Sequence, residues 1–151
     1  MTSNIVPASP VQATAQNIAS SVQNTNNLTV KSAWARRSMS GSSNSVAYVS
    51  LHNSSSKDIQ IVGATALSVA NRVEIHTTAT DSDGVTRMVK LDKLVIPSGG
   101  DIVMQTGGIH IMLLDLKKAL NVGDKVKIHL MLQGVGVYPV ELEIKDLGAG
   151  Q

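Results

Sequence analysis

The chain of 151 residues contains no cysteine. This absence excludes disulfide bonds, thiolate zinc sites and the cysteine-ligated blue-copper centre. Aromatic residues are almost as scarce, with one tryptophan, two tyrosines and no phenylalanine. The 13 basic and 11 acidic residues are dispersed, and without a basic block the chain has no sign of nucleic-acid binding. No apolar run approaches the roughly 20 residues that a membrane-spanning helix needs.

The composition changes near residue 27. Residues 1–27 are rich in Ser, Thr, Asn, Gln and Ala and carry no charged side chain, which predicts a disordered leader or linker. They contain no basic region followed by an apolar stretch, so a signal peptide has been removed or was never there. Residues 28–147 are long enough to form one domain with a real core.

Short alternating segments run through this domain. The clearest is 125–132, whose alternate residues are expected to face a core: Val126, Ile128, Leu130 and Leu132. About nine such segments, separated by turn residues and without helical periodicity, predict an all-β fold, either a β-sandwich or a Greek-key barrel.

The chain has four histidines and six methionines, and His110 and Met112 are the easiest of them to place. Residues i and i+2 of a strand point to the same face. The imidazole of His110 and the thioether of Met112 should therefore project together, while Ile111 and Leu113 alternate onto the core face.

A second pair is predicted across a turn. Alternating segments flank Thr80–Gly84, which is dense in turn-forming residues and indicates a hairpin. A loop centred on Ser82 would set His76 directly opposite Met88, with Cβ atoms about 5 Å apart. A β-bulge would shift this register by one residue.

Two imidazoles and two thioethers, without carboxylate or thiolate, form an unusual set of ligands. Thioethers are soft, neutral ligands that select Cu(I), whereas Ca²⁺, Mg²⁺ and Mn²⁺ prefer oxygen. A structural zinc site would need cysteine or more histidine. The sequence therefore predicts a Cu(I) site formed by His76, Met88, His110 and Met112.

The spacing of these four residues resembles that of the PCuAC family of periplasmic copper chaperones. All four match the family pattern without a gap, and the likeness extends from Leu28 to Lys145. One departure is Thr77, which stands where many members carry a second methionine. Other segments also resemble the family: Trp34–Arg36, Val46–Leu51, Val73–His76, Ile96–Gly100 and Gly107–Leu113.

The resemblance implies a cupredoxin-like arrangement and a carrier that hands Cu(I) to acceptor proteins. It further implies a periplasmic or otherwise extracytoplasmic location, with delivery towards the copper centres of cytochrome c oxidase. Copper donor and acceptor proteins, among them an oxidase subunit or its assembly factors, are the expected partners. We expect a monomer that is neither an enzyme nor membrane-spanning. The lack of cysteine suits an oxidising compartment, where thiols are lost.

Several alternatives remain open at this stage. Met39 lies in a predicted loop, where it would either add a sulfur over the copper site or, as we interpret it, be a loop methionine without a partner. Met104 is interpreted as core filling. His129 and Met131 repeat the i, i+2 spacing, but lysines on the same face favour a solvated surface. The competing function is a structural or adhesive β-sandwich with incidental metal affinity. No catalytic motif supports an enzyme.

Overall fold

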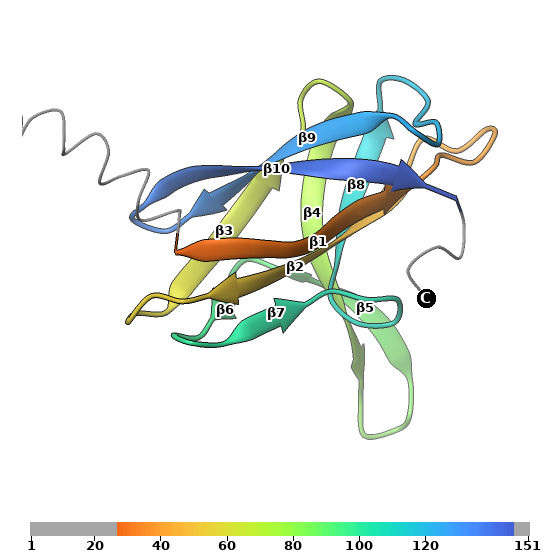
Figure 1. Cartoon of the computed structure of the whole chain (residues 1–151). Coiled ribbons are helices and arrows are strands. Elements are labelled where there is room, and N and C mark those ends of the chain that lie inside the picture. The colour runs from red at the N-terminus through yellow and green to blue at the C-terminus, as the bar shows by residue number, and fades with distance from the viewer. Residues whose placement is uncertain (1–26, 147–151) are drawn as a thin grey trace, which may run out of the picture.

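A computed structural model describes residues 27–146. Within these residues the chain forms ten β-strands and no helix (Figure 1), so no described helix is available to cross a membrane. The predicted leader, 1–27, lies outside the described residues except for Asn27, as does Leu147 at the end of the predicted domain. The strands are β1 (Leu28–Arg36), β2 (Ser45–Asn53), β3 (Ile59–Thr65), β4 (Ala70–Thr80), β5 (Thr86–Leu91), β6 (Leu94–Ile96), β7 (Asp101–Val103), β8 (His110–Leu116), β9 (Lys125–Leu132) and β10 (Gly136–Lys145).

The strands form one mixed sheet. Their order is β5-β4-β8-β2-β1-β10-β9-β3-β6, and β7 pairs with β2. The β1–β10 pairing is parallel, while β4 is antiparallel to both of its neighbours, β5 and β8. The sheet curls until β3 contacts β4, although these strands share no ladder. The all-β prediction is confirmed.

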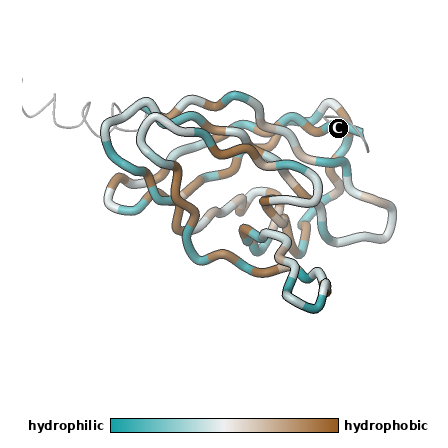
Figure 2. Tube along the Cα trace, turned by 90° about the horizontal axis from the view of Figure 1, so that it is seen from below, coloured by the Kyte–Doolittle hydropathy of each residue, from teal (hydrophilic) through white to brown (hydrophobic). Residues whose placement is uncertain are grey.

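The core follows the period of two along the strands. The predicted inward residues of β9, Val126, Ile128, Leu130 and Leu132, are all buried, while Lys125 is exposed. Hydrophobic and hydrophilic segments are interleaved along the described trace (Figure 2). Burying one such aliphatic side chain stabilises the fold by roughly 1.5–3 kcal/mol, and this fixes which face of each strand points inward.

Proline is placed where the sheet tolerates it. Pro139 pairs with His129 of β9, whereas β10 pairs with β1 only from Glu143 to Lys145. Because Pro139 has no N–H to donate, it fits a stretch of strand with a partner on one side only.

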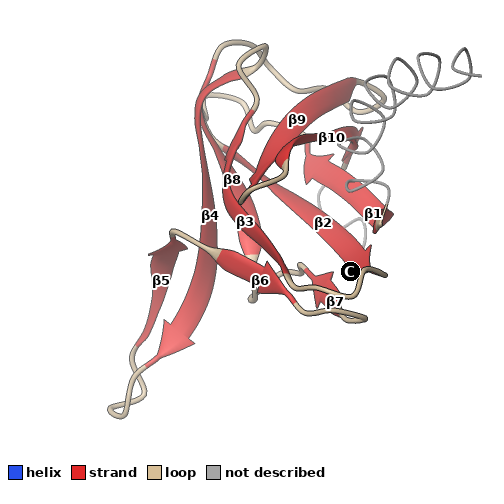
Figure 3. Ribbon diagram, turned by 90° about the vertical axis from the view of Figure 1, so that its left-hand side faces the viewer, coloured by secondary structure: helices blue, strands red, loops and turns tan. Residues whose placement is uncertain are grey.

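The β4–β5 hairpin extends away from the rest of the sheet (Figure 3). Strand β5 pairs with β4 alone, and five of its six residues are exposed. The last two residues of β4 and most of β5 therefore present side chains to solvent beside the body of the domain. The hairpin carries His76 and Met88.

Candidate metal centre

The pairing of β4 with β8 sets His76 directly opposite His110. Their ring centroids are 5.8 Å apart, with the ring planes at 62°. His110 is buried at 4% exposed, and 18% of the His76 side chain is exposed. On β8, Ile111 and Leu113 point to the opposite face, into the core, as their alternation predicts. The fold thus brings two distant imidazoles together at the edge of the core.

Each imidazole donates one hydrogen bond to an oxygen atom. Nδ1 of His110 donates to the carbonyl oxygen of Gly108 at 2.9 Å, and Nε2 of His76 donates to Oε1 of Glu74 at 2.9 Å. The remaining nitrogens, His76 Nδ1 and His110 Nε2, are buried without a hydrogen-bond partner among the described residues. In a neutral imidazole that donates through one nitrogen, the other carries a lone pair. Two lone pairs are therefore available to a metal ion.

Glu74 is held as a carboxylate beside His76. The hydrogen bond from His76 lowers the pKa of Glu74 below its ordinary value, and the charges of Lys90 and Arg72 act in the same direction. Arg72 Nη1 also lies 3.3 Å from Oε2 of Glu74. Neither Glu74 nor Gly108 was predicted from the sequence as part of the site. The signal for Glu74 was its i, i+2 spacing from His76.

Met112 lies on the same face as His110, as predicted. It pairs with Glu74 of β4 on one side and with Val46 of β2 on the other. Met112 is half-buried and lines a cavity of about 210 Å³ together with Met39. The Met112 side chain therefore lies two residues along β8 from His110, on the same face of the strand.

The predicted register of the β4–β5 hairpin is wrong by two residues. Met88 lies opposite Thr78, and His76 lies opposite Lys90. A shift of two residues keeps every side chain on its original face. Met88 therefore stays on the face of His76, one diagonal step away, within reach of a long side chain. It is 62% exposed.

The reason for the shift is the turn chemistry of Asp81. Its backbone N–H donates to the carbonyl oxygen of Val85 at 3.0 Å, and its carboxylate accepts the backbone N–H groups of Asp83 and Val85. Gly84 takes a φ of 82°, in the left-handed region that glycine favours. Asp81 thereby closes the loop one residue later than predicted, and its centre is Asp83 instead of Ser82.

The other candidate donors lie elsewhere. Met104 is buried at 4% exposed, which confirms its assignment to the core. His52 bonds to Asp101 through Nδ1. His129 and Met131 occupy β9, and their Cα partners on β3 and β10 carry neither imidazole nor sulfur: Thr65, Gly63, Pro139 and Val137.

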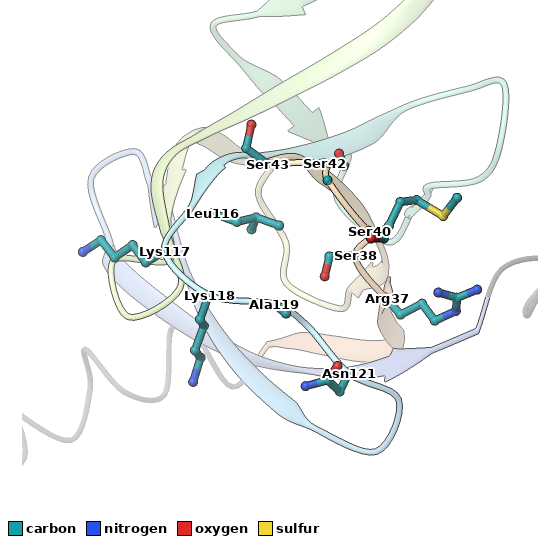
Figure 4. Close-up of a pocket in the computed structure, with 12 residues that line it drawn as sticks. Arg37, Ser38, Ser40, Ser42, Ser43, Leu116, Lys117, Lys118, Ala119 and Asn121 are labelled. Carbon is teal, nitrogen blue, oxygen red and sulfur yellow. The ribbon is translucent and has the colours of Figure 1, made fainter.

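A larger cavity, of about 570 Å³, lies beside the loop that follows β1 (Figure 4). Serine side chains line it, and the cationic side chains of Arg37, Lys117 and Lys118 extend outward around it. It contains neither His76 nor His110. Hydroxyl groups and positive charge make a poor environment for a soft cation, so the cavity is distinct from the candidate metal centre.

Across residues 27–146, no group of three or more His, Asp or Glu side chains is arranged to hold a metal ion. An oxygen-rich calcium or magnesium site is therefore not found in this part of the chain. The donors that do converge are two imidazoles, with thioethers on the same face. The fold and these donors define an all-β domain with a soft, bis-imidazole donor set near its surface.

The chain belongs to the LpqE-like family, whose model, described as "Putative lipoprotein LpqE-like", matches residues 28–144. One relative is "Putative lipoprotein Lxx21020" of Leifsonia xyli subsp. xyli, 32% identical over 117 residues, which are 78% of this chain and 69% of that protein. Another is "Uncharacterized protein RP573" of Rickettsia prowazekii, 37% identical over 99 residues, or 63% of this chain and 54% of that protein.

Solved structures of PCuAC domains share the fold. The apo PCuAC domain from PmoF1 aligns with a TM-score of 0.68 at 23% identity, covering 80% of this chain and 94% of that one. The solution structure of CuI-DR1885 from Deinococcus radiodurans aligns with a TM-score of 0.62 at 30% identity, covering 80% and 79%. These similarities confirm the predicted resemblance to the PCuAC family and the cupredoxin-like fold.

Proposed function

We propose that the protein is a copper chaperone that binds Cu(I) as cargo through His76, Met88, His110 and Met112. The observation that carries this proposal is the pair of buried, unpartnered nitrogens, His76 Nδ1 and His110 Nε2, on rings 5.8 Å apart. A buried polar atom without a partner costs free energy unless something binds it. A metal ion between the rings would satisfy both atoms.

The donor set favours the reduced ion. Two neutral imidazoles and two neutral thioethers suit the soft Cu(I) ion, and the thioethers carry no proton that copper must displace. The similarity to CuI-DR1885, at 30% identity, supports the same choice of metal. No catalytic motif accompanies the site, so we propose a carrier and not an enzyme.

The ligands differ in how easily a partner reaches them. Met88 is 62% exposed on the projecting hairpin, Met112 is half-buried and His110 is buried. An incoming thiolate can replace the sulfur of Met88 first, that of Met112 next, and the imidazoles last. Stepwise exchange of this kind lets copper pass to an acceptor without becoming free in solution.

We further propose that the protein works as a monomer outside the cytoplasmic membrane, between a copper donor and an acceptor in cytochrome c oxidase assembly. The lipoprotein description of its family and of its Leifsonia relative supports this location. The absence of cysteine also suits an oxidising compartment.

Binding is tested by titrating Cu(I) into the protein against a chromophoric Cu(I) chelator under anaerobic conditions. We expect one equivalent to bind, and copper K-edge absorption to show both nitrogen and sulfur neighbours. Absence of binding, or a copper environment without sulfur, would contradict the proposal.

Delivery needs a separate test. Loaded protein is mixed with the apo form of a soluble CuA domain from an oxidase subunit, and the CuA spectrum is followed after oxidation. Copper transfer faster than from the chelator complex is expected. Stoichiometric binding without transfer would retain the Cu(I) carrier and reject the oxidase as its acceptor.

A further inference from the structure

Glu74 stands among the candidate ligands without belonging to the predicted set. It precedes His76 by two residues on β4, so both side chains share a face. Its Cα partner on β8 is Met112. The Glu74 side chain is only 21% exposed. Glu74 therefore shares its face of β4 with one proposed copper ligand and has another as its strand partner.

The orientation of Glu74 is fixed from both sides. Oε1 accepts the Nε2–H of His76 at 2.9 Å, and Oε2 accepts a hydrogen bond from Arg72 at 3.3 Å. Arg72 in turn lies 3.3 Å from Asp115. An acceptor held in this way determines which imidazole nitrogen carries the proton.

The two imidazoles are consequently held in opposite tautomers. Glu74 keeps the proton of His76 on Nε2 and leaves Nδ1 free, whereas the carbonyl oxygen of Gly108 keeps the proton of His110 on Nδ1 and leaves Nε2 free. One acceptor is an anion and the other is neutral. The hydrogen bond to the anion is the stronger of the two.

Charge gives Glu74 a second role. Cu(I) with four neutral ligands leaves a net charge of +1 at a half-buried position. Two cations already lie close to Glu74 and His76, because Lys90 is opposite His76 and Arg72 bonds to the Glu74 carboxylate. Of the described carboxylates, Glu74 is the one hydrogen-bonded to a candidate ligand. Its negative charge offsets that of the ion.

We propose that Glu74 is a positioning residue that makes His76 an Nδ1 ligand, opposite an Nε2 ligand from His110, and that supplies the counter-charge for the cuprous ion. This inference rests on the proposed function, because it concerns the same site. Beyond the proposed function, it states that the two imidazoles bind copper through different ring nitrogens. It also states that a neighbouring anion does not itself bind the metal.

The test compares Glu74→Ala and Glu74→Gln with a matched control, Glu141→Gln, which removes an exposed carboxylate on β10. Long-range ¹H–¹⁵N spectra of the imidazoles are recorded for the metal-free and Cu(I)-loaded proteins. In the metal-free wild type and the control, His76 should carry its proton on Nε2. In Glu74→Ala, both tautomers of His76 should appear.

Affinity for Cu(I) separates the two roles of Glu74. Glu74→Ala should weaken binding by about 10- to 100-fold, the usual cost of losing a partner of a metal ligand. Glu74→Gln keeps an acceptor oxygen but loses the charge, so the tautomer should persist while affinity falls on the order of threefold to tenfold. The Glu141→Gln control should match the wild type, and circular dichroism checks that all variants fold.

The inference is overturned if His76 of the wild type carries its proton on Nδ1, if Glu74→Ala keeps one tautomer and wild-type affinity, or if the loaded protein shows a carboxylate oxygen on copper. Failure of the wild type to bind Cu(I) contradicts the proposed function. The spectra of the metal-free protein still decide whether Glu74 fixes the tautomer of His76.

Discussion

His76 and His110 face each other as direct partners across the β4–β8 ladder, and the nitrogen that each leaves unbonded is buried. Neither lone pair accepts a hydrogen bond from any of the described residues. The arrangement makes both rings equally necessary to any ion that binds between them.

Replacing either ring should therefore abolish tight binding. His76→Ala and His110→Ala should each lower Cu(I) affinity by at least about 100-fold, because losing a ligand costs more than losing a ligand's partner. His129→Ala, on β9, serves as the control and should bind like the wild type. Chelator competition measures all three, and a His110→Ala variant with unchanged affinity would show that copper binds elsewhere.

The two proposed methionine ligands should differ in their effect on stability more than in their effect on copper binding. Met88→Ala and Met112→Ala should each weaken Cu(I) binding by at least about tenfold. Because Met88 is 62% exposed, its replacement should change the free energy of unfolding by less than about 0.5 kcal/mol. Met112 is half-buried, and its replacement should cost about 1 kcal/mol.

Urea unfolding of the metal-free variants measures the free energy of unfolding. Met131→Ala is the control for Cu(I) affinity. Equal affinity of Met88→Ala and the wild type would place Met88 outside the metal centre, with the diagonal step from His76 too long to bridge.

Met39 is expected not to be a ligand, although it lines the same cavity as Met112. Met39 is 50% exposed in the loop between β1 and β2, outside the β4–β8 pairing that sets His76 opposite His110. Met39→Ala should keep Cu(I) affinity within about twofold of the wild type, well below the loss expected from removing a ligand. A larger loss in the competition titration would make Met39 a fifth ligand and the third sulfur donor.

Stability at high pH should depend on Tyr138. Burial raises the pKa of Tyr138, whose hydroxyl donates to the carbonyl oxygen of Leu28 at 2.8 Å. The unfolded chain ionises near pH 10 while the folded chain keeps the proton, so the free energy of unfolding should fall as the pH rises through the folded pKa. Its contribution is complete below the unfolded pKa.

Tyr138→Phe should lose about 1 kcal/mol of stability at neutral pH, from the missing hydrogen bond, and should lose less than the wild type on moving to alkaline pH. Urea titrations at about pH 7 and pH 10.5 provide the comparison. A wild type and a variant that decline in parallel would assign the alkaline loss to other groups.

The sequence alone predicted the features that depend on the alternation of side chains along a strand. The inward residues of β9 and the shared face of His110 and Met112 follow from alternation alone. The chain also showed that β4 and β5 form a hairpin, because strong turn formers lie between two alternating segments.

The register of that hairpin could not be predicted correctly from the sequence. The sequence predicted a loop centred on Ser82, whereas the hydrogen bonds of Asp81 with Val85 centre it on Asp83. Because the register differs from the prediction by an even number of residues, Met88 still lies on the predicted face.

Glu74 was missed for a different reason. Its spacing from His76 showed a shared face, but only the folded side chains show that the carboxylate accepts the Nε2–H. The proximity of Met39 to Met112 also depends on contacts between segments far apart in sequence, which local patterns do not encode.

The direct pairing of His76 with His110 has a thermodynamic consequence. An ion bound by both rings is a reversible cross-link between two distant parts of the chain. Its binding free energy is added to that of folding. At a free copper concentration a thousand times the dissociation constant, the gain is about 4 kcal/mol. The empty carrier is then the form that opens more often, so a protease that cuts unfolded chains spares the loaded molecules and removes those with nothing to deliver.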